Sequence, residues 1–506
     1  MQSPRIHYLP ILGSLGLLLH VPGIMSLLTL VVVFVFGEYY ALYPFLITGV
    51  TTILIAQIVY RLFYNGDECH LWDAMIVAAI SWLICPLVAA IPFYCSLSLY
   101  ITGIDPLQSV ILYHTPINVI FECFSGFTGT GLSLISEPQF FPHTILWWRS
   151  FMQWVGGIGL IVFMLSLVQT TRRSYTLYYA EARSEKLVLT VGQTSRLIWG
   201  IYLAYTLVAI ALMWLSSSSI WEAINHAMTA ISTGGFTIVE NAFYSANVKN
   251  QCSTMFVMFI GAISFSMHYE IILSTSLRVF WKDLEHRWFL ITLIFGVVFV
   301  HFFDMWHLEE LTFMQTAFQW FSALATCGFH SVDMELIAAP TKIFFIAAML
   351  VGGCVGSTAG GLKFERFVNV IQAMSSRFKL VFSKKETDDL DKFSGQSPES
   401  EAPEIIEHYS KKTEKLYAAN VLFTLWIFTL IIGWVLILKF SPNVTPINCL
   451  FEVVSAMSNV GLTTGAVHLD LPAAPKIVYI LLMWLGRLEI VPAVILFLAI
   501  PVTKSE

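Results

Sequence analysis

The chain has 506 residues, of which 57% are hydrophobic and only 12% are charged, and its net charge is −6. A soluble domain carries roughly 25% charged residues, so this composition excludes an ordinary soluble protein and indicates one that crosses the membrane many times. The sequence has no basic stripe of the kind that nucleic acid binding requires, so we expect a membrane-embedded protein without a nucleic acid partner.

Apolar segments of about 20 residues, the length that spans a bilayer, recur along the whole chain. The first holds no charged residue, and only one basic residue, Arg5, precedes it without an evident cleavage site. We therefore expect a retained helix and not a signal peptide. In chain order the predicted spans lie near 10–36, 43–63, 72–100, 146–170, 193–216, 252–277, 288–305, 341–376, 416–440 and 474–501.

The distribution of basic residues predicts the orientation of these spans. Lysines and arginines gather between 172 and 196, between 278 and 287, and between 363 and 385, whereas 95–120, 133–147 and 299–340 hold none. The positive-inside rule places the basic regions in the cytoplasm and, with them, the N-terminus. The one clearly hydrophilic segment, 386–415, then lies on the cytoplasmic side, where we expect a partly disordered loop or linker.

Two stretches that lie 330 residues apart are nearly the same: "TPINVIFECFSGFTGTGL" begins at Thr115 and "TPINCLFEVVSAMSNVGL" begins at Thr445. Similar short phrases, "ISTGGFT" and "ATCGFHS", follow semi-apolar segments of about 12 residues, which are too short to cross a bilayer and suit re-entrant helices. In all four copies a hydrogen-bonding side chain stands nine residues before a glycine. The pairs are Glu122 with Gly131, Asn225 with Gly234, Gln319 with Gly328, and Glu452 with Gly461.

The chemistry of this phrase suits a cation path. Thr115 and Thr445 are good N-caps, and Pro116 and Pro446 suit the first helical position, so each helix would point its negative C-terminal dipole end into the membrane. The extended segment that follows leaves backbone carbonyls unpaired, which is tolerated at membrane depth only in protein or along a water-filled path. Rings of such carbonyls replace the hydration shell of a monovalent cation.

One such loop alone would favour an ordinary turn between helices, but four copies favour a pore. The predicted cation-binding segments are Thr128, Gly129, Thr130 and Gly131; Ile231, Ser232, Thr233 and Gly234; Ala325, Thr326, Cys327 and Gly328; and Ser458, Asn459, Val460 and Gly461.

Longer motifs carry a resemblance to a known family. They are "WRSFMQWVGGIGLIVF" at 148–163, "AINHAMTAISTGGF" at 223–236, "GGCVGSTAGGLK" at 352–363, and "FEVVSAMSNVGLTTG" followed by "LMWLGRLEIVPAVIL". From about residue 10 to its end, the chain resembles the Trk/Ktr/HKT superfamily of potassium transporters, and it looks closest to the bacterial TrkH branch.

The resemblance implies an all-α polytopic membrane protein with four pseudo-symmetric helix–pore loop–helix repeats around one pore, preceded by two extra N-terminal transmembrane helices. It also implies potassium selectivity, with one filter glycine from each repeat. The sequence departs from the family pattern at Gly129 and at Cys327, where threonine is usual. Because a carbonyl ligand belongs to the backbone, we expect these departures to affect affinity more than selectivity.

The predicted organisation is 1–66 (N-terminal helices), 67–175, 176–285 and 286–382 (repeats 1 to 3), 383–414 (cytoplasmic linker) and 415–506 (repeat 4).

The same resemblance assigns the glycine-rich segment 352–363 to an intramembrane loop that gates the pore, and places Arg487 beneath the filter. The alternative for Arg487 is a structural ion pair with Glu122, Glu452 or Glu489. The predicted gate residues are Gly352, Gly353, Gly356, Ser357, Thr358, Gly360, Gly361, Lys363 and Arg487.

The predicted function is potassium uptake across the plasma membrane, which in a bacterium is the inner membrane. The alternative is a less selective potassium and sodium transporter or a cation symporter. The resemblance implies a homodimer, a TrkA-like cytoplasmic partner that binds nucleotides, and no cofactor besides the transported K⁺.

We expect no enzyme, because the spans hold no HExxH, GxSxG or paired aspartates. A carrier of organic solutes would favour inverted repeats. The eight cysteines form no CxxC and predict free thiols, without a disulfide framework or a zinc site.

Overall fold

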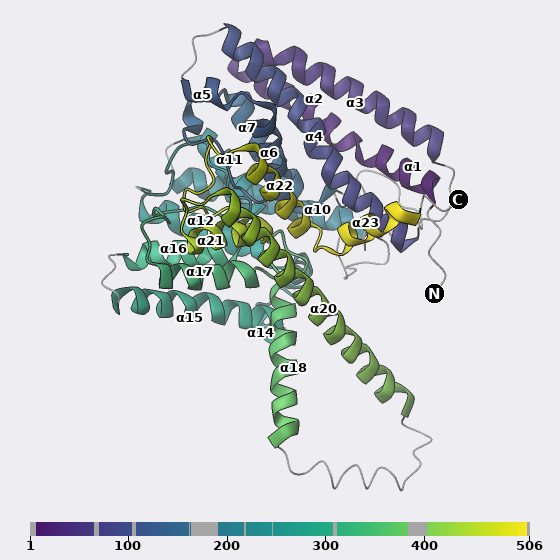
Figure 1. Ribbon diagram of the computed structural model, residues 1–506, viewed down its shortest axis with the longest axis vertical. Coiled ribbons are helices and arrows are strands. Elements are labelled where there is room, and N and C mark those ends of the chain that lie inside the picture. Colours follow the sequence, from purple (N-terminus) through teal and green to yellow (C-terminus); the bar gives the residue numbers. More distant parts are fainter. Residues whose placement is uncertain are drawn as a thin grey trace.

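The computed structural model describes residues 7–64, 70–103, 108–160, 162, 191–216, 219–244, 246–306, 311–382 and 402–502. Within these residues the chain is helical and contains no β-strand, as expected (Figure 1). The helices are α1 (Tyr8–Leu18), α2 (His20–Phe36), α3 (Leu42–Phe63), α4 (Leu71–Gly103), α5 (Gln108–Tyr113), α6 (Pro116–Thr128), α7 (His143–Ile158), α10 (Val191–Ser216), α11 (Ile220–Ile231), α12 (Val248–Ala262), α13 (Phe265–Ser274), α14 (Arg278–Lys282), α15 (Leu284–Trp306), α16 (Phe313–Leu324), α17 (Ala339–Val351), α18 (Phe364–Phe382), α20 (Ala402–Phe440), α21 (Pro446–Met457), α22 (Ala473–Arg487) and α23 (Val491–Val502), with short 3₁₀ turns at Tyr39–Ala41 and Pro138–Phe140.

Six helical segments of the described chain are long and apolar enough to cross a membrane, and two further bent pairs qualify if each is counted as one span. Helices α1 and α3 pack closely at small residues: a Cβ on Gly16 of α1 would lie 2.6 Å from the backbone nitrogen of Tyr60 in α3. Close approach at small residues is how helices associate in lipid, where no hydrophobic force drives them together. The chain is therefore a multi-span membrane protein.

Three of the predicted spans are not continuous helices. The predicted span over 252–277 is broken, because α12 and α13 meet at an angle of 99°, and the predicted span over 474–501 is broken where α22 and α23 meet at 109°. The predicted span 341–376 is divided into α17 and α18 by segment 352–363. At the second bend, Glu489 and Ile490 have left-handed φ angles of 55° and 67°, which no helix accommodates. Hydropathy detects apolar length, and it does not detect such turns.

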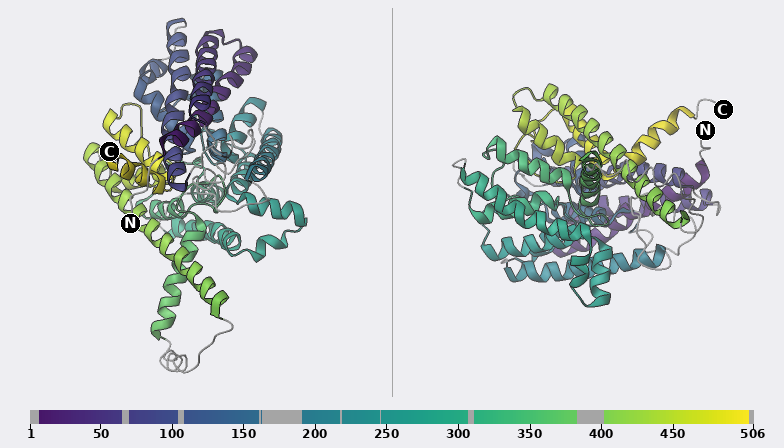
Figure 2. Two further views of the ribbon diagram at one scale, coloured as in Figure 1. Left: turned by 90° about the vertical axis from the view of Figure 1, so that its right-hand side faces the viewer. Right: turned by 90° about the horizontal axis from the view of Figure 1, so that it is seen from below.

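Two helices leave the body of the molecule as a diverging pair (Figures 1 and 2). They are α18 and α20, which flank the hydrophilic segment of the sequence. The predicted linker at 383–414 lies partly outside the described residues, and its part from residue 402 onward belongs to α20. The end of the predicted span 146–170 also lies outside the described residues, beyond α7.

Candidate functional site

Four helices of 12 or 13 residues, α6, α11, α16 and α21, form the frame of the candidate site. The side chains of Ser219, Thr312 and Thr445 cap three of them by accepting a hydrogen bond from a backbone N–H three residues on. Thr115 occupies the same position of α6 without making that bond, although Pro116 begins the helix as predicted. The C-terminal turns of all four helices are buried.

Each of these short helices is followed by the same backbone turn. Two residues of each turn have left-handed φ angles, and they are separated by one residue with an ordinary angle. The second of the two is always a glycine, which adopts this conformation without strain. The pairs are Gly129 (70°) and Gly131 (83°), Thr233 (50°) and Gly235 (76°), Thr326 (52°) and Gly328 (90°), and Asn459 (51°) and Gly461 (92°).

These four glycines form a closed ring with the carbonyl groups of the neighbouring turns. At each glycine a Cβ atom would lie about 2 Å from a carbonyl oxygen of the next turn, far inside van der Waals contact. The contacts run from Gly131 to the oxygen of Gly234 (2.0 Å), from Gly235 to that of Cys327 (2.1 Å), from Gly328 to that of Val460 (2.1 Å), and from Gly461 back to that of Thr130 (2.2 Å). No side chain fits at any of these positions.

The ring corrects the prediction for the second repeat by one residue. Gly235, which the prediction omits, occupies the position of Gly131, Gly328 and Gly461, while Gly234 supplies the carbonyl that faces Gly131. Ile231 is the last residue of α11 and precedes the turn. The sequence does contain a signal for the correct register, because each of the four ring glycines is followed by Leu or Phe.

When the second repeat is counted from Gly235, the polar residue nine positions before the glycine is His226, and all four such residues have the same role. In every repeat this side chain accepts a hydrogen bond from the backbone N–H twelve residues further on, so that it braces the extended segment from behind. The bonds join Glu122 to Leu134 (3.2 Å), His226 to Ile238 (3.4 Å), Gln319 to Ser331 (2.9 Å) and Glu452 to Thr464 (2.7 Å). The predicted Asn225 instead donates to Trp221 within its own helix, at 2.9 Å.

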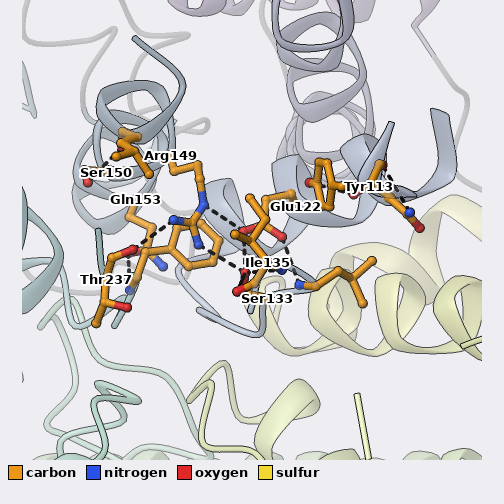
Figure 3. Close-up of polar contacts among 12 residues, drawn as sticks. Tyr113, Glu122, Ser133, Ile135, Arg149, Ser150, Gln153 and Thr237 are labelled. Atoms are coloured by element: carbon orange, nitrogen blue, oxygen red, sulfur yellow. Dashed lines mark hydrogen bonds and ion pairs between the residues drawn. The ribbon is translucent and has the colours of Figure 1, made fainter. Parts of the chain in front are cut away.

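Two side chains of α7 connect the first turn to the second (Figure 3). The buried Arg149 donates to Glu122 Oε1 at 2.8 Å and to the carbonyl oxygen of Thr237 at 2.9 Å. Gln153 donates from Nε2 to the carbonyl oxygen of Gly234 at 2.5 Å, and its Oε1 accepts from the backbone of Phe236 at 3.0 Å. Neither residue was identified as a site residue from the sequence, although a charged residue within an apolar span is a signal for one.

Two buried lysines explain why the first and fourth copies both contain Thr-Pro-Ile-Asn. Lys342 of α17 donates to Asn448 Oδ1 at the start of α21 (3.0 Å), and Lys476 of α22 donates to Asn118 Oδ1 at the start of α6 (2.7 Å). Each lysine also donates to a backbone carbonyl seven residues before it. The two asparagines therefore accept hydrogen bonds that join one repeat to the next.

The glycine-rich segment 352–363 lies against the turns of three repeats. The hydroxyl of Thr358 accepts from Thr233 Oγ1 in the second turn at 3.3 Å, and its single proton is shared between the carbonyl oxygens of Ile231 (3.0 Å) and Gly261 (2.8 Å). The backbone of Gly360 donates to Thr326 Oγ1 at 2.6 Å, and that of Gly361 donates to the carbonyl oxygen of Ser458 at 2.9 Å.

The other residues of this segment shape its own backbone. Left-handed φ angles occur at Gly352, Gly356, Gly361 and Lys363. A Cβ on Gly353 would lie 2.4 Å from that of Ala359. Ser357 donates to the Cys354 carbonyl at 2.6 Å, and Lys363 Nζ donates to the Ala359 carbonyl.

Arg487 lies at the end of α22, and it was predicted at the middle of a continuous span. It donates to the carbonyl oxygens of Gly156 and Gly157 at the end of α7, and its guanidinium lies 5.0 Å from the ring centre of Trp82. The glutamates considered as its ion-pair partners have other contacts: Glu122 pairs with Arg149, Glu489 pairs with Arg366, and Glu452 accepts from Thr463 and Thr464.

Cavities lie on both sides of the ring. On the side of segment 352–363, a small cavity of about 50 Å³ is lined by residues that include Gly360, Lys363, Asn459 and Arg487. On the opposite side, a cavity of about 540 Å³ is lined by three ring glycines together with Glu240 and Asp470. In a separate pocket that Tyr244 and Asp333 line, burial together with the Asp333 and Glu240 carboxylates raises the pKa of Tyr244 to about 12.

Comparisons with known proteins agree with this arrangement. A family model described as "TrkH: Cation transport protein" matches residues 45–506. An uncharacterized cation transporter of Methanocaldococcus jannaschii is 29% identical over 96% of this chain and 94% of its own length. The Trk system potassium uptake protein TrkH of Halomonas elongata is 27% identical over 85% of this chain and 86% of its own length. The crystal structure of the potassium transporter TrkH from Vibrio parahaemolyticus superposes with a TM-score of 0.78 at 21% identity, covering 97% of this chain and 98% of that one, which indicates the same fold.

Proposed function

This chain belongs to the TrkH family of cation transport proteins, and from that premise we propose that it takes up potassium through the ring of four turns. The observation that carries the proposal is the closure of the ring, in which each glycine lies against a carbonyl group of the next turn. Carbonyl oxygens arranged in this way coordinate a dehydrated monovalent cation. The names of the relatives from Halomonas elongata and Vibrio parahaemolyticus favour potassium as that cation.

In this proposal the selectivity filter consists of the turns 128–131, 232–235, 325–328 and 458–461. Because the ligands are backbone carbonyls, Cys327 can replace a threonine without removing a ligand. The resident cation enters from the wider cavity, whose Glu240 and Asp470 raise the local concentration of cations. The C-terminal ends of the four short helices add their negative dipole ends to the same region.

The filter assignment is tested by flux measurements in proteoliposomes that hold the purified full-length chain. We expect rubidium uptake to exceed sodium uptake in the unmodified protein. The variant Gly131→Ser should narrow that difference by lowering rubidium uptake, because its Cβ would lie 2.0 Å from the carbonyl oxygen of Gly234 and would push this ligand out of place. Equal rubidium and sodium uptake by the unmodified protein would instead favour the alternative, a less selective monovalent cation transporter or symporter.

We further propose that segment 352–363 is the gate and that Arg487 sets the barrier beneath the filter. The segment is hydrogen-bonded to three of the four turns, through Thr233, Thr326 and Ser458, so opening the path requires these bonds to break. Helix α18 follows this segment directly and leaves the body of the molecule beside α20 (Figure 1). In this proposal the two helices lie on the cytoplasmic side, where a TrkA-like nucleotide-binding partner would dock and pull on them. This proposal includes a homodimer and a cytoplasmic N-terminus.

The substitution Thr358→Val is expected to increase rubidium flux in the absence of any partner. Valine keeps the volume of threonine and removes two hydrogen bonds: the one whose proton Ile231 and Gly261 share, and the one accepted from Thr233. Each such bond contributes about 0.5–1.5 kcal/mol, so the population of the open gate should rise about 5- to 100-fold. The control is Thr254→Val in α12, because among the described residues the hydroxyl of Thr254 bonds within its own helix, to the Asn250 carbonyl at 2.9 Å. Unchanged flux in Thr358→Val would contradict the gate assignment.

A further inference from the structure

A cluster of metal-binding side chains lies where segment 352–363 meets the start of α15. Glu285, His286 and Cys354 each offer a ligand atom, and these atoms lie within 4.8 Å of one another. His286 and Cys354 are buried, and Glu285 is half-buried. Cys354 is a free cysteine, as are the six others that the structure describes, whereas Cys69 lies outside the described residues.

The histidine of this cluster is held by a carboxylate, as metal-binding histidines usually are. Asp283 Oδ1 lies 2.5 Å from Nδ1 of His286, and a carboxylate in this position fixes the ring and directs its other nitrogen to a metal ion. That other nitrogen, Nε2, lies 3.0 Å from the hydroxyl of Ser264, at the bend between α12 and α13. The hydroxyl therefore occupies a position that a metal ion would compete for.

The glutamate and the cysteine link this histidine directly to the proposed gate. Glu285 Oε1 accepts hydrogen bonds from the backbone of Val355 at 2.8 Å and of Glu365 at 3.2 Å. The backbone N–H of Cys354 donates to the carbonyl oxygen of Ala262 at 3.0 Å. Three separate parts of the chain thus converge: the α12–α13 bend, the start of α15 and the gate segment.

We propose that Glu285, His286 and Cys354 bind a divalent transition-metal ion of the zinc class, which fastens segment 352–363 to the start of α15. A thiolate, an imidazole and a carboxylate are ligands that select zinc over magnesium and calcium. On a tetrahedral zinc ion, bond lengths of about 2.0–2.3 Å place ligand atoms roughly 3.3–3.8 Å apart, so the three groups need to close by about 1 Å. With three protein ligands the fourth position belongs to water, and binding is reversible.

The inference that a metal ion binds here depends only on these contacts. The inference that the metal ion affects transport depends in addition on the proposed function. Binding favours the arrangement in which the gate segment lies against the turns, so zinc should reduce rubidium flux. A chain that binds zinc but carries no cation under any condition would disprove the proposed function and leave the metal site intact. A chain that carries rubidium but binds no zinc would disprove the metal site alone.

The test is titration of the detergent-purified full-length chain with Zn²⁺ and Co²⁺, after removal of bound metal. We expect one ion per chain and, with Co²⁺, a near-ultraviolet charge-transfer band that reports a thiolate ligand. Asp283→Asn should weaken binding about 10- to 100-fold, and Cys354→Ser should weaken it further and remove the band. Mg²⁺ in excess should not compete.

The matched control is Cys85→Ser, which removes another buried thiol, in α4, and should leave binding and the band unchanged. His286→Gln serves as a second ligand variant if Cys354→Ser does not fold. A band that persists in Cys354→Ser, or zinc binding that is unaffected in His286→Gln, would overturn the proposal. So would a titration of the unmodified chain that shows no bound ion.

Discussion

Replacing Gly235 with alanine is expected to abolish rubidium uptake, although the sequence offers Gly234 as an equally good filter residue. A Cβ on Gly235 would lie 2.1 Å from the carbonyl oxygen of Cys327, and the residue has a φ of 76°. Relief of the clash requires that carbonyl to move by about 1 Å, and a 1 Å displacement of a positioned group reduces a rate about 100-fold. The measurement is initial rubidium uptake per mole of reconstituted protein.

Gly129 provides the matched control, because it shares the left-handed conformation and lacks the contact. Its φ is 70°, yet no atom lies within 4 Å of a Cβ built there. Gly129→Ala therefore adds only conformational strain of about 1–2 kcal/mol, and we expect it to retain most of the flux. In Gly234→Ala the Cβ meets the flexible side chain of Gln153 at 2.5 Å, so an intermediate loss is expected. Equal losses in Gly129→Ala and Gly235→Ala would refute the ring geometry.

Loss of Arg149 is expected to destabilise the protein by about 3–5 kcal/mol. Arg149→Met keeps much of the side-chain volume but leaves the carboxylate of Glu122 without its charged partner, and both side chains are at most 2% exposed. Breaking a buried ion pair by removing one partner has this effect because an uncompensated charge remains in a medium of low polarity. Thermal unfolding of the detergent-purified protein, combined with rubidium uptake, measures the loss.

The double variant Glu122→Gln with Arg149→Met separates the unpaired charge from the lost packing. It should recover a large part of the stability, because replacing both partners of a buried pair is often nearly neutral. Arg196→Met is the control for loss of an arginine: this residue is exposed, and within the described residues its side chain bonds to the Gly192 carbonyl of its own helix, at 3.3 Å. A double variant no more stable than Arg149→Met would show that the pair acts through packing and not through charge.

Much of the architecture could be predicted from local patterns alone. Apolar length identified the spans, and the four short helices were identified by their length, with Thr and Pro marking the starts of the first and fourth. The repeated phrase located three of the four ring glycines and the bracing residues Glu122, Gln319 and Glu452. These features depend on residues close together in the sequence, so that periodicity, capping and composition report them directly.

Contacts between distant residues were decided only by the tertiary structure. In "STGG" both glycines satisfy the local pattern, and the choice of Gly235 follows from its contact with Cys327 in the next repeat. The bends at 263–264 and 488–490 lie within apolar runs that are indistinguishable from straight spans by hydropathy.

The pairing of Lys476 with Asn118 joins residues 358 positions apart, and the Glu285–Cys354 cluster joins residues about 70 apart. Such partners are chosen by how the repeats close on one another, because their free energy depends on burial and on distances that a linear pattern does not contain. The sequence by itself therefore determined which elements form, and the closure of the four turns into a ring determined which atoms face one another across it.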